Sequence, residues 1–354
     1  MGDQSVRAAL AELVQGRDLS REGMTAVLRE IMAGDAHPSQ LGALLMGLAT
    51  KGETPEEIAG AAAAMREAMT PVPTAATDLV DTCGTGGSGV PRRNVSTAVA
   101  IVLAACGVKV AKHGNRAASS RSGSADVLEA LGVNIRATPR TVARCIDEVG
   151  VGFLFAAALH PAMTHAMPVR KALGVRTLFN LLGPLTNPAG ANRQLLGVFD
   201  PARCVPLARA LSALGSTRVL VCHGFREGVR AAEDAPWGID DLSPEGESLV
   251  AHASGGVVQR WVLTPEMAGV ERFGLEEIAG GDPAENAEAL SAVLHGARGR
   301  YRDAVVYSGA AALLVAGEEP LPALPQLASR VAAALDDGSA AATLEALVKT
   351  SNPA

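Results

Sequence analysis

The chain has 354 residues, of which 48% are hydrophobic, 3% aromatic and 19% charged. These values exclude a disordered chain and suit two domains whose cores are built from Ala, Leu and Val. The formal net charge of -6 argues against a broad basic face for nucleic acid, and we expect no nucleic-acid partner. An anionic small substrate remains possible, because it needs only a local group of cations.

The first seventy residues predict a series of helices. Val6, Leu10, Leu13 and Val14 recur at helical spacing and predict one buried face. Thr54-Pro55-Glu56-Glu57 predicts a helix start in which Thr54 caps and Glu57 reaches back. Pro71 and Pro73 mark a linker. We therefore predict a helical domain over 1–72, which a later helical segment around 165–190 joins, and an α/β domain over 73–354.

From Asp78 onward, short apolar runs alternate with helical segments. Such alternation predicts an α/β domain with a central, mostly parallel sheet. Polar residues follow these apolar runs. Because ligands bind at the carboxyl ends of strands in such sheets, these polar residues predict a ligand site. The strand-like runs are 79–80, 108–110, 153–155 and 219–221. Further helices are predicted near Val127, from a cap at Asp282, and over 303–315.

Neither a membrane span nor a structural cysteine framework is predicted. The longest stretch without Asp, Glu, Lys or Arg, 149–169, is interrupted by histidines and prolines. The first residues lack the apolar core of a signal peptide. The five cysteines are scattered singly, which argues against a zinc site or disulfides. We expect a soluble, cytoplasmic protein.

A glycine-rich turn follows the first strand-like run. Gly84-Thr85-Gly86-Gly87-Ser88-Gly89 allows consecutive N–H groups to converge on phosphate oxygens. Asn94-Val95-Ser96-Thr97 then opens an apolar helix over 98–105, whose N–H groups form a second anion-binding surface. This is neither the dinucleotide nor the Walker pattern. A glycine turn alone is more often a tight turn, but the hydroxyl-rich helix start favours a phosphate site.

A second polar cluster lies between apolar segments. Lys112-His113-Gly114-Asn115-Arg116 is followed by a stretch with four serines, 117–126. Lysine supplies a point charge to a diphosphate, and serines supply donors around it. The competing interpretation, a solvated polar loop, is hard to reconcile with the apolar sequence on both sides.

These residues resemble the successive signatures of the anthranilate phosphoribosyltransferases. The resemblance covers Ala9 to the C-terminus and includes His160-Pro161-Ala162-Met163, Pro168-Val169-Arg170 and the long motif 176–188. It implies a small helical domain and a larger α/β domain in a homodimer. The fold would be the one shared with pyrimidine nucleoside phosphorylases rather than a Rossmann-like fold. The implied reaction transfers phosphoribose from PRPP to the anthranilate amine in tryptophan biosynthesis.

The resemblance also assigns residues to each ligand. It places PRPP on Gly84, Thr85, Gly87, Ser88, Arg92, Asn94, Val95, Ser96, Thr97, Lys112, His113, Gly114, Asn115, Arg116, Ser119, Ser120 and Ser124. Anthranilate is assigned to Gly84, Asn115, His160 and Arg170, with Arg170 on the carboxylate and His113 also lining the channel. Mg²⁺ is assigned to Ser96, Asp240 and Asp241. The resemblance implies no protein nucleophile, and Lys112 and the metal stabilise the departing pyrophosphate.

The sequence departs from the resembled pattern near the chemistry. Ser88 stands where Asp is common, Arg92 where a small hydroxyl residue is usual, and Arg93 where an aromatic is usual. Asp241 replaces a Glu, Ala157 a Pro and Ser308 an Asn. The added positive charge predicts tighter PRPP binding or a shifted magnesium optimum. An insertion, 225–237, precedes the acidic pair; it is either a harmless surface loop or a segment that repositions the pair or covers the site.

Alternative functions remain at this stage. A paralogue could use the same PRPP site on another aromatic amine or base, although Asn115 and Arg170 suit a carboxylate beside an amine. A nucleoside phosphorylase is disfavoured by the 112–116 run, and an inactive nucleic-acid-binding relative by the acidic balance.

Overall fold

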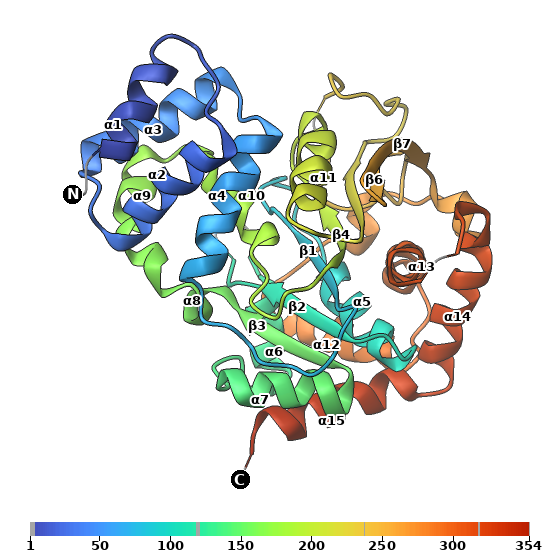
Figure 1. Ribbon diagram of the computed structural model, residues 1–354. Helices are drawn as coiled ribbons and strands as arrows, with labels where there is room; N and C mark the ends of the chain where they lie inside the picture. The colour runs from blue at the N-terminus through green and yellow to red at the C-terminus, as the bar shows by residue number, and fades with distance from the viewer. Residues whose placement is uncertain (1–3, 118–120, 237, 318, 354) are drawn as a thin grey trace.

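The computed structural model describes residues 4–117, 121–236, 238–317 and 319–353. A group of N-terminal helices lies beside a sheet that has helices on both faces (Figure 1). The N-terminal helices are α1 (Gln4–Leu13), α2 (Arg21–Ala33), α3 (Pro38–Lys51) and α4 (Pro55–Ala68).

The central sheet has seven strands in the order β3-β2-β1-β4-β5-β6-β7. The pairings among the first five strands are parallel, and β6 and β7 are added antiparallel. The prediction of a mostly parallel central sheet beside a helical unit is therefore confirmed. The strands are β1 (Val80–Gly84), β2 (Val110–Gly114), β3 (Val151–Phe155), β4 (Arg193–Gly197), β5 (Arg218–Gly224), β6 (Ser248–Ser254) and β7 (Val257–Leu263).

The sheet separates two hydrophobic clusters. Along β5, Val219 and Val221 pack with the N-terminal helices and α11, whereas Leu220 and Cys222 pack with α5 and α12–α15. This alternation follows from the two-residue period of a strand. The remaining helices are α5 (Val95–Ala105), α6 (Ser124–Ala130), α7 (Pro139–Arg144), α8 (Ala156–Leu159), α9 (Met167–Leu173), α10 (Phe179–Leu182), α11 (Cys204–Ala213), α12 (Pro283–Leu294), α13 (Arg300–Ala316), α14 (Leu324–Asp336) and α15 (Ser339–Ser351).

Part of the middle of the chain packs with the N-terminal helices. Ala166, before α9, and Leu178 and Leu181, around α10, share the hydrophobic cluster of α1–α4. Figure 1 shows α9 and α10 beside these helices. The helical unit is thus assembled from two stretches of sequence.

Local signals place several boundaries well and others less well. Thr54 and Glu57 form the expected reciprocal cap, and Asp282 caps α12. Val14 was expected on the buried face but lies beyond the end of α1 and is 87% exposed. α5 and α6 begin three residues earlier than predicted, because hydroxyl-bearing residues there are helical rather than flanking.

The insertion 225–237 leaves and returns at one point of the sheet. Gly224 and Ile239 exchange backbone hydrogen bonds of 3.0 and 2.8 Å, and His223 Nε2 accepts from the Gly238 N–H at 2.8 Å. Arg226 pairs with Glu245, and Glu233 with Arg260 on β7. These contacts hold the described part of the insertion at the β6–β7 end of the sheet, which favours the surface-loop interpretation.

Two further expectations concern cysteines and membranes. All five cysteines are free, as their isolated spacing predicts. Within the ranges that the structure describes, none of the helices has the length and apolar character needed to cross a bilayer.

A buried carboxylate in the helical unit generates a stability prediction. Glu57 is fully buried and accepts from Leu19 N (2.9 Å), Thr54 N (2.8 Å) and Lys51 Nζ (2.9 Å). Glu57→Ala removes the acceptor of the Leu19 and Thr54 N–H groups, whereas Lys51 Nζ keeps Asp18 at 2.7 Å. We therefore expect the free energy of unfolding to fall by about 2–4 kcal/mol in urea titrations. Exposed Glu56, one residue away in the same turn, is the control. Glu56→Ala should change the free energy of unfolding by less than about 0.5 kcal/mol. Equal effects of the two substitutions would contradict this account.

Candidate active site

Two strand-end glycines allow a third segment to cross the sheet edge. Gly84 ends β1 and Gly197 ends the neighbouring β4. A Cβ at Gly197 would lie 2.0 Å from the Asp240 carbonyl oxygen, and a Cβ at Gly84 would lie 3.0 Å from Asp240 Oδ2. Any side chain at Gly197 would therefore displace this segment. The absence of both side chains brings the acidic pair against the start of the glycine turn.

The glycine turn uses backbone conformations that favour glycine. Gly86, Gly87 and Gly89 have φ values of 69°, 89° and 73°. The turn is held at its base, where Thr85 N donates to Gly197 O at 2.9 Å and Thr85 Oγ1 accepts from Phe199 N at 3.1 Å. It is held further along by Arg176, which donates to the Gly87 carbonyl oxygen and stacks on the Phe199 ring at 4.1 Å.

The N-terminus of α5 presents hydroxyl groups beside this turn. Ser96 O accepts from Thr82 Oγ1 at 2.9 Å, which ties the helix start to β1. Thr97 is 1% exposed, and its Oγ1 finds no hydrogen-bond partner among the described residues. A buried hydroxyl without a partner at a helix N-terminus suits an anionic ligand. Val95 differs from these residues, because its side chain lies in the core.

Asn94 holds the segments around the helix start together. Its Oδ1 accepts from Asn286 Nδ2 at 3.1 Å, and its carbonyl oxygen accepts from the Tyr301 hydroxyl at 3.2 Å. The Asn94 amide also approaches Ser122 O at 3.4 Å. Asn94, which is predicted to bind PRPP, thus also connects the start of α5 to α12 and α13 through these hydrogen bonds.

Lys112 and His113 lie within β2, not after it as the sequence suggested. Lys112 is 3% exposed, and its Nζ lies 2.5 Å from Thr82 O and 3.4 Å from Ser96 Oγ. Burial lowers the pKa of Lys112, and the nearby Asp81 opposes that shift. The ammonium group therefore lies between β1 and the start of α5.

Asp81 is a fully buried carboxylate beneath these groups. It accepts from His113 N at 3.0 Å and from Asn187 Nδ2 at 2.9 Å. Burial raises the pKa of Asp81 to about 6, while Lys112 and these two donors act in the opposite direction. Asp81 thereby connects β1, β2 and the loop after α10.

Two buried histidines face each other at the carboxyl end of β2. His113 Nε2 and His160 Nε2 are 3.2 Å apart, so one ring donates to the other. Burial lowers the pKa of His113 to about 3, with a further contribution from His160, and lowers the pKa of His160 to about 4. Both rings are therefore neutral at physiological pH.

The loop after β2 turns outward. A Cβ at Gly114 would lie 2.2 Å from Ser124 Oγ, so only glycine fits there. Asn115 O accepts from Ala125 N at 3.2 Å, and Ser124 Oγ approaches the same oxygen at 3.4 Å. Arg116 points away from the site, because it pairs with Asp126 and Glu129 at 2.8 Å. Its geometry does not support the predicted contact with PRPP. Ser119 and Ser120 lie outside the described residues.

Arg170 comes from α9 in the helical unit. Its guanidinium lies over the Phe179 ring at 5.3 Å, and NH1 is 3.7 Å from Met167 Sδ. None of the acidic side chains in the described ranges forms an ion pair with it. Burial lowers its pKa. A half-buried guanidinium on an aromatic ring suits a planar carboxylate ligand.

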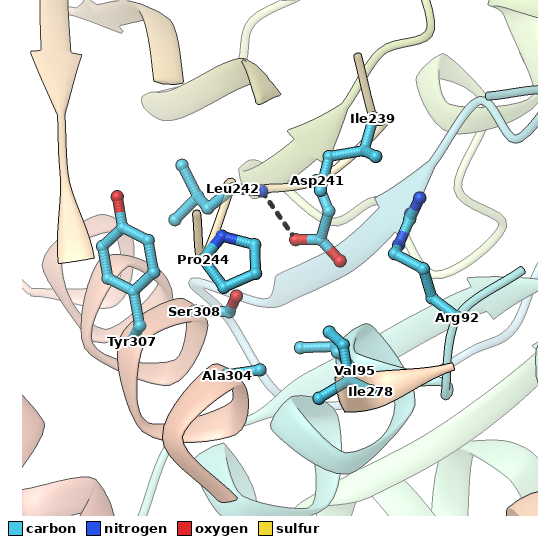
Figure 2. Close-up of a pocket in the computed structure, with 10 residues that line it drawn as sticks. All are labelled: Arg92, Val95, Ile239, Asp241, Leu242, Pro244, Ile278, Ala304, Tyr307 and Ser308. Atoms are coloured by element: carbon cyan, nitrogen blue, oxygen red, sulfur yellow. Dashed lines mark hydrogen bonds between the residues drawn. The ribbon is translucent and has the colours of Figure 1, made fainter. Parts of the chain in front are cut away.

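Asp240 and Asp241 form the acidic edge of the site. Asp240 Oδ1 is 3.1 Å from Arg92 NH2, and Ser88 Oγ is 3.0 Å from Arg92 NH1. Figure 2 shows the Asp241 carboxylate pointing into a small cavity lined also by Arg92 and Ser308. Burial raises the pKa of Asp241, and Arg92 and the Leu242 N–H oppose that effect.

Three residues without a predicted site role position the site. Arg176 holds the glycine turn, and Asp81 and Asn187 hold β2 against the loop after α10. Arg176 and Asn187 belong to the long motif 176–188, which was the available signal. Asp81 precedes the glycine turn by three residues. Nothing in the sequence indicated its role other than an acidic residue within an apolar run.

The chain matches two parts of one glycosyl transferase family, the helical bundle domain over 7–69 and the a/b domain over 76–341. The anthranilate phosphoribosyltransferase of Anaeromyxobacter dehalogenans (strain 2CP-C) is 48% identical over 97% of this chain and 98% of the relative. The anthranilate phosphoribosyltransferase of Phenylobacterium zucineum (strain HLK1) is also 48% identical, over 97% of this chain and 98% of the relative.

Solved structures agree with these relatives. The crystal structure of anthranilate phosphoribosyltransferase from Thermus thermophilus matches with a TM-score of 0.88 and 45% identity, over 97% of this chain and 99% of that one. The Saccharomyces cerevisiae enzyme in complex with PRPP and Mg matches with a TM-score of 0.86 and 26% identity, over 99% and 98%. This chain belongs to the anthranilate phosphoribosyltransferase family of glycosyltransferases.

Proposed function

We propose that this chain transfers the phosphoribosyl group of PRPP to the anthranilate amine, giving N-(5-phosphoribosyl)anthranilate and pyrophosphate in tryptophan biosynthesis. The observation that carries the proposal is the meeting of three anion-binding elements at one sheet edge. These are the glycine turn, the α5 N-terminus with unpartnered Thr97 Oγ1, and buried Lys112. Such a site suits a substrate with several phosphates.

In this proposal, PRPP lies along the glycine turn and the start of α5. Gly84, Thr85 and Gly87 line the phosphates, and Ser96 and Thr97 supply hydroxyl groups. The Thr85 N–H itself donates to Gly197 O, so the N–H donors come from the rest of the turn. Lys112 is held beside Ser96 and contributes positive charge towards the departing pyrophosphate. Catalysis then arises from orientation and charge stabilisation, because the leaving group is already activated.

The acidic pair fits a magnesium ion bound together with a substrate. No group of three or more His, Cys, Asp or Glu side chains in the described part of the chain is arranged to hold a metal by itself. Mg²⁺ is commonly held by one or two carboxylates plus substrate phosphates, and Asp240 lies directly beside Gly84. Asp240 and Asp241, with Ser96 for a second ion, would hold Mg²⁺. When bound, it would neutralise charge on the pyrophosphate.

Anthranilate is proposed to lie between the helical unit and the end of β2. Arg170 takes the carboxylate in a bidentate contact. The neutral His113–His160 pair and Asn115 line the side where the amine attacks C1 of PRPP. An acceptor other than anthranilate, such as another aromatic amine or a base, is the second candidate, because the PRPP elements do not depend on the acceptor.

Assembly, domain division and location are also proposals. We propose a homodimer on the strength of the family resemblance. We propose division into 1–72, joined by the segment around 165–190, and 73–354. The acidic chain and its free cysteines suit the cytoplasm.

The decisive experiment mixes the purified protein with PRPP, Mg²⁺ and anthranilate and follows the loss of anthranilate fluorescence. Loss that requires all four components supports the proposed reaction. PRPP binding without anthranilate turnover would instead favour the different-acceptor candidate, which a panel of aromatic amines and bases would then identify.

Arg170 provides a matched pair of variants on one helix. We expect Arg170→Ala to raise KM for anthranilate about 10- to 100-fold, the loss expected for a charge-assisted hydrogen bond. PRPP affinity should stay unchanged. Lys171→Ala removes the same charge from an exposed neighbour and should leave both constants unchanged. A similar KM for the two variants would exclude Arg170 as the carboxylate ligand.

The histidine pair predicts a pH dependence of stability. The unfolded rings bind protons near pH 6.5, and the folded rings only near pH 3 and 4. Between these limits the unfolded state binds more protons, so stability falls as the pH is lowered. When the pH falls from 7 to 5, we expect each ring to lower the free energy of unfolding by about 2 kcal/mol.

Urea unfolding at both pH values measures this loss. His160→Gln should reduce it by about the contribution of one ring, roughly 2 kcal/mol. The variant of an exposed histidine, His295→Gln, should show the wild-type loss. An unchanged loss in His160→Gln would show that this ring already accepts a proton in the folded protein.

A further inference from the structure

Arg92 lies on a segment whose backbone is fixed. Between the glycine turn and α5, Arg93 N donates to Ile278 O at 3.0 Å, and a Cβ at Gly280 would lie 2.3 Å from Arg92 O. The 278–280 segment therefore packs closely on this stretch. The position of the Arg92 side chain follows from this packing rather than from a loose surface loop.

The Arg92 side chain links the two elements proposed to hold pyrophosphate and metal. Its NH1 donates to Ser88 Oγ in the glycine turn at 3.0 Å, and its NH2 lies 3.1 Å from Asp240 Oδ1. The side chains of Arg92 and Asp240 are only 12% and 10% exposed. Salt screens a largely buried ion pair of this kind only weakly, so the guanidinium keeps a fixed position beside Asp240.

The guanidinium retains capacity for an anion. Arginine has five N–H donors in a planar fork that matches phosphate oxygens. The two contacts above are those that the described residues make with it. Beside Asp240, this guanidinium would supply positive charge to a bound pyrophosphate, as a magnesium ion would.

The interior side of the acidic pair has no room for a hydrated ion. The cavity that the Asp241 carboxylate faces, between Arg92 and Ser308, measures about 10 Å³ (Figure 2). That volume accommodates about one water molecule, whereas bound Mg²⁺ keeps several. A hydrated magnesium ion therefore does not fit in this cavity, which Arg92 also lines. Three other positions that depart from the resembled pattern, Ser88, Arg92 and Ser308, thus lie close to Asp240 and Asp241.

We propose that Arg92 is a fixed cation of this active site, which binds the pyrophosphate of PRPP beside Asp240 and replaces part of the positive charge otherwise supplied by Mg²⁺. This inference rests on the proposed function. It implies that PRPP binds without a divalent ion. It also implies that the charge of Arg92 weakens metal binding at Asp240.

The test is calorimetric titration of PRPP into the intact protein, first in EDTA and then at increasing Mg²⁺. We expect wild type to bind PRPP in EDTA, and Arg92→Gln to bind it about tenfold or more weakly. The difference should shrink as Mg²⁺ rises. Arg92→Lys should recover part of the affinity in EDTA, because it keeps the charge without the fork.

Arg93→Gln is the matched control. Arg93 carries the same charge one residue away, but its guanidinium lies over the Tyr301 ring at 5.4 Å. This variant should bind PRPP as wild type does at every Mg²⁺ concentration. An equal weakening in Arg93→Gln would mean that general charge, not the Arg92 contact, is responsible, and would overturn the proposal.

A metal titration gives a second measurement that is independent of activity. Mn²⁺ binding to the protein without PRPP, followed by electron paramagnetic resonance, should be tighter in Arg92→Gln than in wild type. Weaker binding would mean that Arg92 orders the carboxylates for the metal, and would contradict the proposal.

Other outcomes separate this inference from the proposed function. Wild type that binds PRPP only with Mg²⁺ overturns the inference without reference to any variant. If Arg92→Gln weakens PRPP binding equally at all Mg²⁺ concentrations, the role of Arg92 is purely structural. That result also overturns the inference. Wild type that binds no PRPP under any condition overturns the proposed function itself.

Discussion

The site depends on one buried carboxylate. Asp81 lies in the middle of the sheet with no exposed surface, where an unpaired charge would cost several kcal/mol. Its donors come from two other segments, the His113 N–H on β2 and the Asn187 amide after α10. Because Asn187 Nδ2 also donates to Ala111 O at 2.8 Å, the loop is held against both β1, through Asp81, and β2, through Ala111. Lys112 and His113 are positioned as a consequence.

This arrangement divides the proposed chemistry between two parts of the molecule. The groups proposed to bind phosphate lie on the sheet edge and α5, which share the large cluster with α12–α15. Arg170 lies on α9, in a segment that packs with α1–α4. His113 and His160 meet where these parts adjoin, and their low pKa values keep that junction uncharged. An uncharged lining suits an aromatic acceptor, and Arg170 is the group that we propose for its carboxylate.

The acidic edge shows how backbone packing brings distant residues together. Asp240 follows the described insertion in sequence, yet the Gly224–Ile239 pairing returns the chain to the end of β5. Gly84 and Gly197 then leave space for it to cross β1 and β4. Arg92 meets Asp240 from a segment 148 residues away. The electrostatics of this edge therefore depend on an arginine and a carboxylate whose proximity no local pattern indicates.

Local sequence was sufficient to predict individual elements and the family. The Thr54 cap, the Asp282 cap and the glycine turn are readable because caps and positive φ values depend on few neighbouring residues. The long motif 176–188 carried the family resemblance. The resemblance also proposes ligand roles for individual residues. Of these, Lys112 lies beside Ser96 at the start of α5, and Arg170 lies over Phe179 in the segment that packs with α1–α4.

Which of these residues face one another was settled by the packing of the whole chain. Packing turned Arg116 outward to Asp126 and Glu129, although Lys112 and His113 of the same motif are buried. It buried the Val95 side chain in the core, exposed Val14 beyond the end of α1 and placed Arg92 on Asp240. Side-chain direction and long-range pairing depend on how separate elements pack, and residues adjacent in sequence carry no information about partners that are far away along the chain.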